Sequence, residues 1–141
     1  MKSLLKTTVA CAAFMTAVVP AAHAHGTDPH GGHVDAHMKK LHAIMPMFSL
    51  AGAELESAIR KGDAVAVKDQ ADRILASVPD LKKSKPHRNV NQREKFVELA
   101  TNLDKAVTSV VDLAKKEDFA GAKAAFKKVE TACVACHAKF R

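Results

Sequence analysis

Apolar side chains recur at alternating steps of three and four residues along most of the chain from Val34 to Phe140. Such steps place side chains on one face of an α-helix, because the helix makes one turn every 3.6 residues. No stretch alternates apolar and polar residues in the way that a half-buried β-strand does. The periodicity therefore predicts an all-α protein.

The first two apolar stripes cover residues 34–61 and 64–78. Pro46 interrupts the first stripe and should kink that helix, because proline lacks a backbone N–H and leaves a carbonyl one turn earlier without its donor. The dipeptide Gly62–Asp63 is expected to provide the C-terminal stop of one helix and the N-cap of the next. Pro79 is expected to end the second helix.

A basic linker, residues 80–91, precedes the last two stripes. Asn91, with Glu94 three residues later, is the expected N-cap of the third helix. The polar turn Lys115–Asp118 then leads into the fourth helix, which continues to the end of the chain. Four amphipathic helices with two short turns and one longer linker predict an antiparallel up-down-up-down four-helix bundle. Many expected core positions are alanine, which leaves room for a large flat ligand.

The fourth stripe ends in Cys133-Val134-Ala135-Cys136-His137. Cys-x-x-Cys-His is the attachment signature of a c-type haem. Cysteines three residues apart lie on one helical face and can reach both vinyl groups of one porphyrin edge, while the histidine offers a nitrogen to the iron. A thiol–disulfide site is the competing interpretation, but such sites favour a helix N-terminus. The motif predicts one covalent haem c, with Cys133 and Cys136 as thioethers and His137 as the proximal iron ligand.

The N-terminus has the pattern of a secretory leader. Lys2 and Lys6 precede an apolar run that ends at Ala22-His23-Ala24, a small-x-small cleavage site. The run is shorter than the ~20 residues that a membrane-spanning helix needs. Residues 1–24 are therefore predicted to be a signal peptide that is cleaved on export to the periplasm. Cys11 leaves with this segment, so the mature chain keeps only the two cysteines of the motif.

Residues 25–33 are polar and rich in glycine, and we expect them to form a flexible arm. Four histidines fall between His25 and His37, and the last two stand four residues apart, a spacing that can chelate zinc or copper on one helical turn. No thiol or second group of ligands completes such a site, so a solvated arm is the favoured interpretation. The domain itself is predicted to occupy residues 34–141.

The charge of the chain is mildly positive. Lys and Arg number 22 against 15 Asp and Glu, and loss of Lys2 and Lys6 leaves 20 against 15, a net charge of +5. This excess suits docking on an acidic redox partner and falls short of the basic stripe of a nucleic-acid-binding protein. Trp and Tyr, which stack on bases, do not occur. The sequence leaves the oligomeric state, monomer or homodimer, open.

With the bundle and the motif placed, the mature chain resembles the class II c-type cytochromes, the cytochrome c prime family. The stretch from Gly62 to Pro79 is similar to the family's second helix, and the stretch from Asp118 onward is similar to its fourth. The family ends in Cys-x-x-Cys-His-x-x-aromatic-basic, which matches Cys133, Cys136, His137, Phe140 and Arg141. The resemblance implies one haem in a four-helix bundle, with the motif histidine as the proximal ligand.

The resemblance also implies two functional classes, which differ in the sixth iron ligand. Some members leave the iron five-coordinate and bind small gases such as nitric oxide, whereas others supply a methionine from the first helix and transfer electrons. Met38 resembles that methionine, and in an antiparallel bundle the start of the first helix lies level with the end of the fourth. Met45 lies ~10 Å further along the axis and is expected to be a packing residue. A core role for Met38, or ligation by His37 or His42, is the alternative.

Met38 and His137 together predict an electron carrier, because iron with two axial side chains changes its oxidation state without exchanging ligands. The alternatives are a gas-binding protein with an open iron site and a metal-binding module that uses the histidine-rich arm. The chain has no nucleophile with a base at helical spacing and no glycine-rich phosphate loop, so we do not expect an enzyme.

Overall fold

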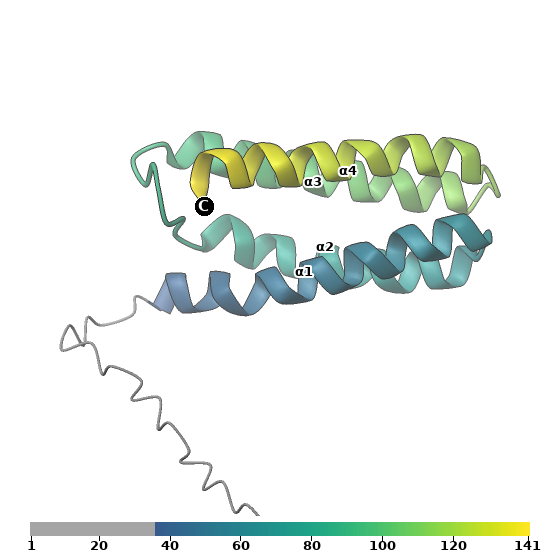
Figure 1. Ribbon diagram of the computed structural model, residues 1–141, viewed down its shortest axis with the longest axis horizontal. Helices are drawn as coiled ribbons and strands as arrows, with labels where there is room; N and C mark the ends of the chain where they lie inside the picture. The colour runs from purple at the N-terminus through teal and green to yellow at the C-terminus, as the bar shows by residue number, and fades with distance from the viewer. Residues whose placement is uncertain (1–35) are drawn as a thin grey trace, which may run out of the picture. The chain divides into compact units, whose positions relative to one another are not determined.

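The structure, a computed structural model, describes residues 36–141. The predicted signal peptide, the predicted arm and Val34 lie outside the described residues. Residues 36–141 form four helices and no β-strand, namely α1 (Ala36–Lys61), α2 (Ala64–Lys83), α3 (Arg93–Ala114) and α4 (Phe119–Phe140). Consecutive helices run in opposite directions (Figure 1). The predicted all-α, up-down-up-down four-helix bundle is confirmed.

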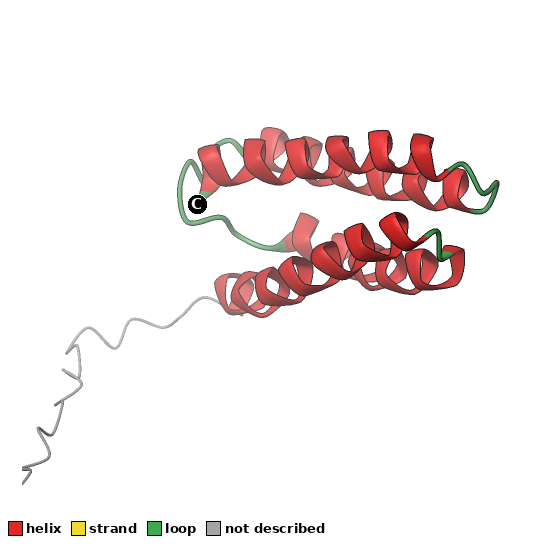
Figure 2. Ribbon diagram, turned by 45° about the vertical axis from the view of Figure 1, so that its right-hand side comes forward, coloured by secondary structure: helices red, strands yellow, loops and turns green. Residues whose placement is uncertain are grey.

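The helices form two layers, α1 with α2 and α3 with α4, which are joined mainly through α2 and α3. The contact between α1 and α4 is the smallest of these helix pairings. Figure 2 shows the two short interhelical turns at one end of the bundle and the longer α2–α3 loop, residues 84–92, at the other. We call the end with the two short turns the turn end. The other end, which contains loop 84–92 and the last turns of α4, is called the motif end.

Both turns at the turn end are closed by aspartate caps. Gly62 has a φ of +69°, which glycine adopts without the steric cost that a side chain brings. Asp63 accepts a hydrogen bond of 2.9 Å from the backbone N–H of Ala66, as the sequence predicts for an N-cap. Asp118 does the same for α4, accepting a bond of 2.8 Å from the N–H of Gly121.

The prediction that Pro79 ends α2 is wrong, because α2 continues for one more turn to Lys83. Proline costs the helix one hydrogen bond, but Val78 and Leu81 on either side of it are buried. The burial of these side chains offsets that loss. Ser84 then closes the helix, since its N–H and its Oγ both donate to the carbonyl of Leu81, at 3.0 and 2.7 Å.

The predicted N-cap of α3 is also wrong. The cap is Gln92 rather than Asn91, and its side chain makes no capping bond. The start of α3 is fixed instead by Arg93, whose guanidinium donates to the carbonyls of Lys82 and Ser84 at the end of α2. The start of α3 is therefore set by the contact of Arg93 with the end of α2, and not by a capping side chain.

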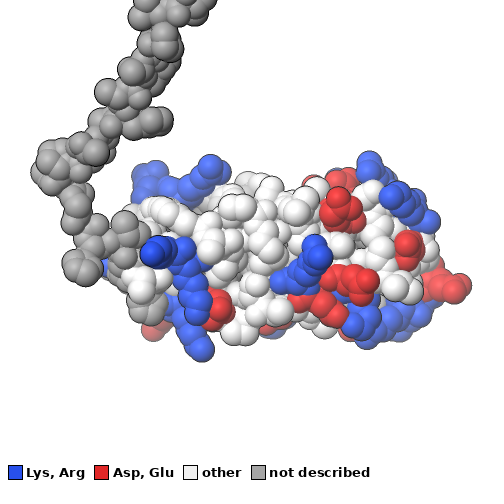
Figure 3. All heavy atoms as spheres, turned by 90° about the horizontal axis from the view of Figure 1, so that it is seen from below, with Lys and Arg blue, Asp and Glu red and all other residues white. Residues whose placement is uncertain are grey.

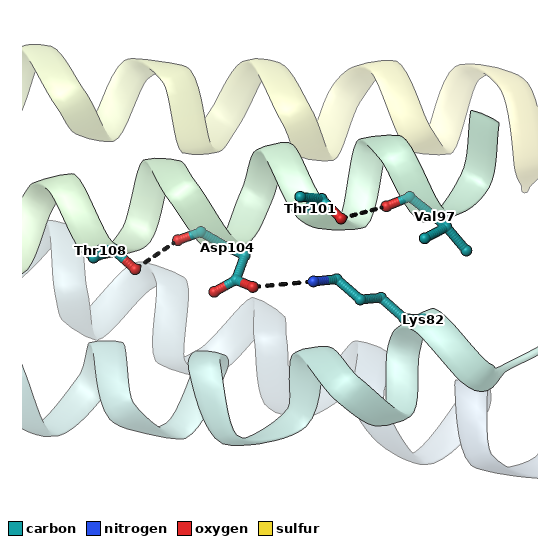
Figure 4. A network of polar contacts seen from close by, with 5 residues as sticks. All are labelled: Lys82, Val97, Thr101, Asp104 and Thr108. Atoms are coloured by element: carbon teal, nitrogen blue, oxygen red, sulfur yellow. Dashed lines mark hydrogen bonds and ion pairs between the residues drawn. The ribbon is translucent and has the colours of Figure 1, made fainter. Parts of the chain in front are cut away.

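Completely buried side chains of all four helices meet toward the turn end, among them Leu55, Val67, Val107, Val110 and Ala122. At the motif end, Phe96 and Pro86 are also fully buried. Toward the motif end, Lys82 of α2 reaches Asp104 of α3 at 3.1 Å and ties these helices together (Figure 4). No helix within residues 36–141 is both long and apolar enough to span a bilayer.

Candidate functional site

The motif lies on the inner face of α4, as the periodicity predicts. Cys133 and Cys136 are half-buried and pack against the core, whereas Val134 and Ala135 between them are exposed. His137, one residue further, is an exposed side chain of the next turn. The helix thus turns both sulfurs toward the interior from a single face.

A cavity of about 700 Å³ stands in front of the two cysteines, within the range of about 300–1,000 Å³ that ligand pockets span. All four helices and loop 84–92 contribute to its wall, which is mainly apolar and has no Asp or Glu side chain among its described residues. Its aliphatic and aromatic lining is Leu41, Phe48, Leu81, Phe96, Leu99, Leu103 and Phe140. Its chemically active lining is His42, Met45, His87, Cys133, Cys136, His137 and Arg141.

The pKa values of the two thiols differ from those of a redox-active cysteine pair. Burial raises the pKa of the Cys136 thiol to about 11, and the neighbouring Cys133 adds to the shift. Burial, with a smaller contribution from Glu130, also raises the pKa of Cys133. Thiol–disulfide enzymes depend on a lowered thiol pKa, because the thiolate is the attacking species. Both thiols are thus kept protonated at neutral pH, which disfavours the thiol–disulfide interpretation.

Loop 84–92 caps the end of α4 and so holds the motif in place. The backbone N–H groups of His87 and Arg88 both donate to the carbonyl of Phe140, each at 3.2 Å. Asn89, which has a φ of 53°, donates its side-chain amide to the carbonyl of Lys139 at 2.5 Å. These bonds satisfy carbonyls that a helix C-terminus leaves without intrahelical partners.

The structure separates the two methionines that the sequence analysis weighed as partners of the motif. Met45 packs against the core and lines the cavity, whereas Met38 is half-buried and does not line it. Met38 lies in the first turn of α1, and the part of α1 that lines the cavity begins one turn later, at Leu41. The motif itself begins two turns before the end of α4.

Two imidazoles that line the same cavity, His42 and His87, have little or no signal in the sequence. His42 of α1, considered above as an alternative iron ligand, has its Nε2 atom 3.1 Å from Nε2 of His87 in loop 84–92. In the sequence, His87 is one residue of the basic linker 80–91. No periodic signal marks a loop residue, so only the folded backbone reveals that these side chains meet.

The residues in this cavity fit a c-type haem. Two thiols on one helical face, an adjoining imidazole and a thioether on α1 provide the expected donors. The apolar wall suits the porphyrin faces, and Arg141 suits anionic propionates. The fit rests on the kinds of donor and on their presence in one cavity.

Residues 79–141 match the model of the protein family described as Cytochrome C'. The match covers the last turn of α2, loop 84–92, α3 and α4 with its motif, and it does not extend to α1. The resemblance stated from the sequence is thereby confirmed for the part of the chain that carries the motif. No curated protein was found to match the chain.

Proposed function

We propose that the chain, whose residues 79–141 match the family described as Cytochrome C', carries electrons as a periplasmic monohaem cytochrome. Cys133 and Cys136 would hold the haem through thioethers, and His137 would be the proximal ligand. The bound haem supplies a one-electron couple between ferric and ferrous iron. The chain's own part is to anchor the porphyrin, to keep it in an apolar cavity and to fix the axial ligands.

The observation that carries the proposal is the thioether of Met45 in the wall of the cavity that the motif lines. A methionine ligand raises the reduction potential and keeps the iron six-coordinate in both oxidation states. The geometry supports Met45 in this role better than Met38, which lies outside the cavity wall. Ligation by Met38 stays a prediction from the sequence, and the experiment below distinguishes the two.

The charge of the motif end supports a partner with an acidic surface. On the face shown in Figure 3, Lys and Arg dominate the motif end at the left, whereas acidic side chains mix with them at the turn end. Lys39 and Arg88 are exposed there, whereas Lys40 forms an ion pair of 2.9 Å with Asp80. Basic side chains around the place where electrons leave would steer an acidic redox partner toward it.

Single alanine variants of Met45 and Met38 test the axial ligand. We expect Met45→Ala to turn low-spin iron into high-spin iron, to lower the reduction potential and to admit carbon monoxide. Met38→Ala, the matched control, should leave the absorption spectra of both oxidation states unchanged. A spectral change in Met38→Ala alone would assign the ligand to Met38, and unchanged spectra in both variants would exclude Met38 and Met45 as iron ligands.

A further inference from the structure

Two exposed imidazoles from separate elements face each other at the motif end. His42 belongs to α1 and His87 to loop 84–92, 45 positions later in the sequence. Their Nε2 atoms are 3.1 Å apart, their ring centroids are 4.9 Å apart and their planes differ by 25°. Both rings line the cavity that the motif also lines, and haem attachment by the motif does not require them.

We propose that His42 and His87 form a binding site for a divalent transition-metal cation that prefers imidazole, such as Zn²⁺ or Cu²⁺. In its neutral form each ring offers one nitrogen lone pair, the usual donor of histidine to these metals. The site is distinct from the haem iron and adds a metal-binding function to the proposed electron carrier.

The separations of the pair agree with two ligands of one metal. Nitrogens at about 2.0–2.1 Å from a four-coordinate cation stand about 2.8–3.4 Å apart for angles between a right angle and the tetrahedral angle. If each ring points its nitrogen at the metal, the ring centroids stand about 4.5–5.3 Å apart. The observed 3.1 and 4.9 Å both fall within these ranges.

The surroundings of the pair favour a preformed but weak site. The backbone N–H of His87 donates to the carbonyl of Phe140 at 3.2 Å, so the loop is held in position without a metal. In the part of the chain that the structure describes, no cluster of three His, Cys, Asp or Glu side chains could hold an ion. Water would therefore complete the coordination. A metal on both rings would join α1 to loop 84–92 and stabilise the folded state by mass action.

Titration of the mature haem-loaded protein with Zn²⁺ alone, followed by calorimetry and by thermal unfolding, tests the site. We expect one Zn²⁺ to bind and to raise the unfolding temperature. His42→Ala and His87→Ala should each weaken the binding at least tenfold and remove the thermal shift. Both side chains are exposed, so neither variant leaves a buried void. A thermal unfolding transition recorded without metal verifies that each variant is folded.

The matched control replaces His25, His30 and His33 of the N-terminal segment by alanine and should keep the binding. Zn²⁺ affinity that survives in His42→Ala and His87→Ala, or is lost only in the control, would overturn the proposal. Failure of the unmutated protein to bind Zn²⁺ would also overturn it. A changed haem spectrum in His42→Ala without added metal would show that His42 serves the iron, and would contradict a separate site.

Discussion

The turn end and the motif end of the bundle consist of the same four helices but are filled in different ways. At the turn end, side chains such as Leu55 and Val107 are fully buried, and Asp63 and Asp118 cap the helices that begin there. At the motif end, the helices surround a cavity of about 700 Å³, and loop 84–92 covers the end of α4.

This difference indicates that the two ends obtain their stability from different sources. The turn end is stabilised by its own packing, because close contact among its side chains maximises dispersion and apolar burial. The motif end leaves apolar surface facing a cavity, which costs free energy until a ligand covers it. A bound haem should therefore stabilise the motif end most, and defects at the two ends should have separable effects.

Replacement of both motif cysteines should have the largest effect. We expect Cys133→Ser with Cys136→Ser to abolish covalent haem and to speed amide hydrogen exchange at the motif end far more than at the turn end. Haem staining after denaturing electrophoresis and exchange measured by mass spectrometry provide the two readouts. Val134→Ala, at an exposed position between the cysteines, is the control and should keep the haem. Stained haem in the double variant would contradict the assignment.

A truncation in the turn-end core should affect stability and leave the haem unchanged. Leu55 is fully buried, so Leu55→Ala should lower the free energy of unfolding by about 2–5 kcal/mol. The haem absorption spectrum should not change, because Leu55 does not line the cavity. Chemical denaturation and spectroscopy on the same sample check both statements. A shifted spectrum would show that the two ends are coupled.

The smallest effect is expected at the turn between α3 and α4. Glu117 has a φ of 59°, a left-handed conformation that costs a residue with a side chain roughly 1–2 kcal/mol. Glu117→Gly should raise the free energy of unfolding by about 0.5–1 kcal/mol, since the greater freedom of glycine in the unfolded chain offsets part of the gain. Lys116→Gly, where the backbone is not left-handed, should bring no gain. Equal effects in the two variants would contradict the explanation.

The fold could be predicted because its determinants are local and periodic. The three-and-four spacing gave the four helices, and Gly62–Asp63 marked a turn whose glycine and cap the structure contains. The boundaries around loop 84–92 could not be predicted in this way. They depend on the burial of Leu81 beyond Pro79 and on Arg93 reaching back to α2, and both are tertiary contacts.

The candidate site was predictable on α4 and less so on α1. The residue types and the spacing of the motif indicate its chemistry. Which residue of α1 faces the motif depends on how α1 and α4 are aligned. Alignment at the motif end selects Met38, which is not among the residues that line the cavity. Counting from the turn end, where α1 ends and α4 begins, selects a different residue. Cys136 lies 17 positions after Phe119, and 17 positions before Lys61 is residue 44, next to Met45.

The absorption spectrum of the purified protein, recorded in the oxidised and the reduced state and again under carbon monoxide, tests the central claim most directly. An electron carrier with His137 and a side chain of α1 on its iron should be low-spin in both states and should not change under the gas. High-spin, five-coordinate iron that binds carbon monoxide in the unmutated protein would contradict the account and would identify a gas-binding member of the family.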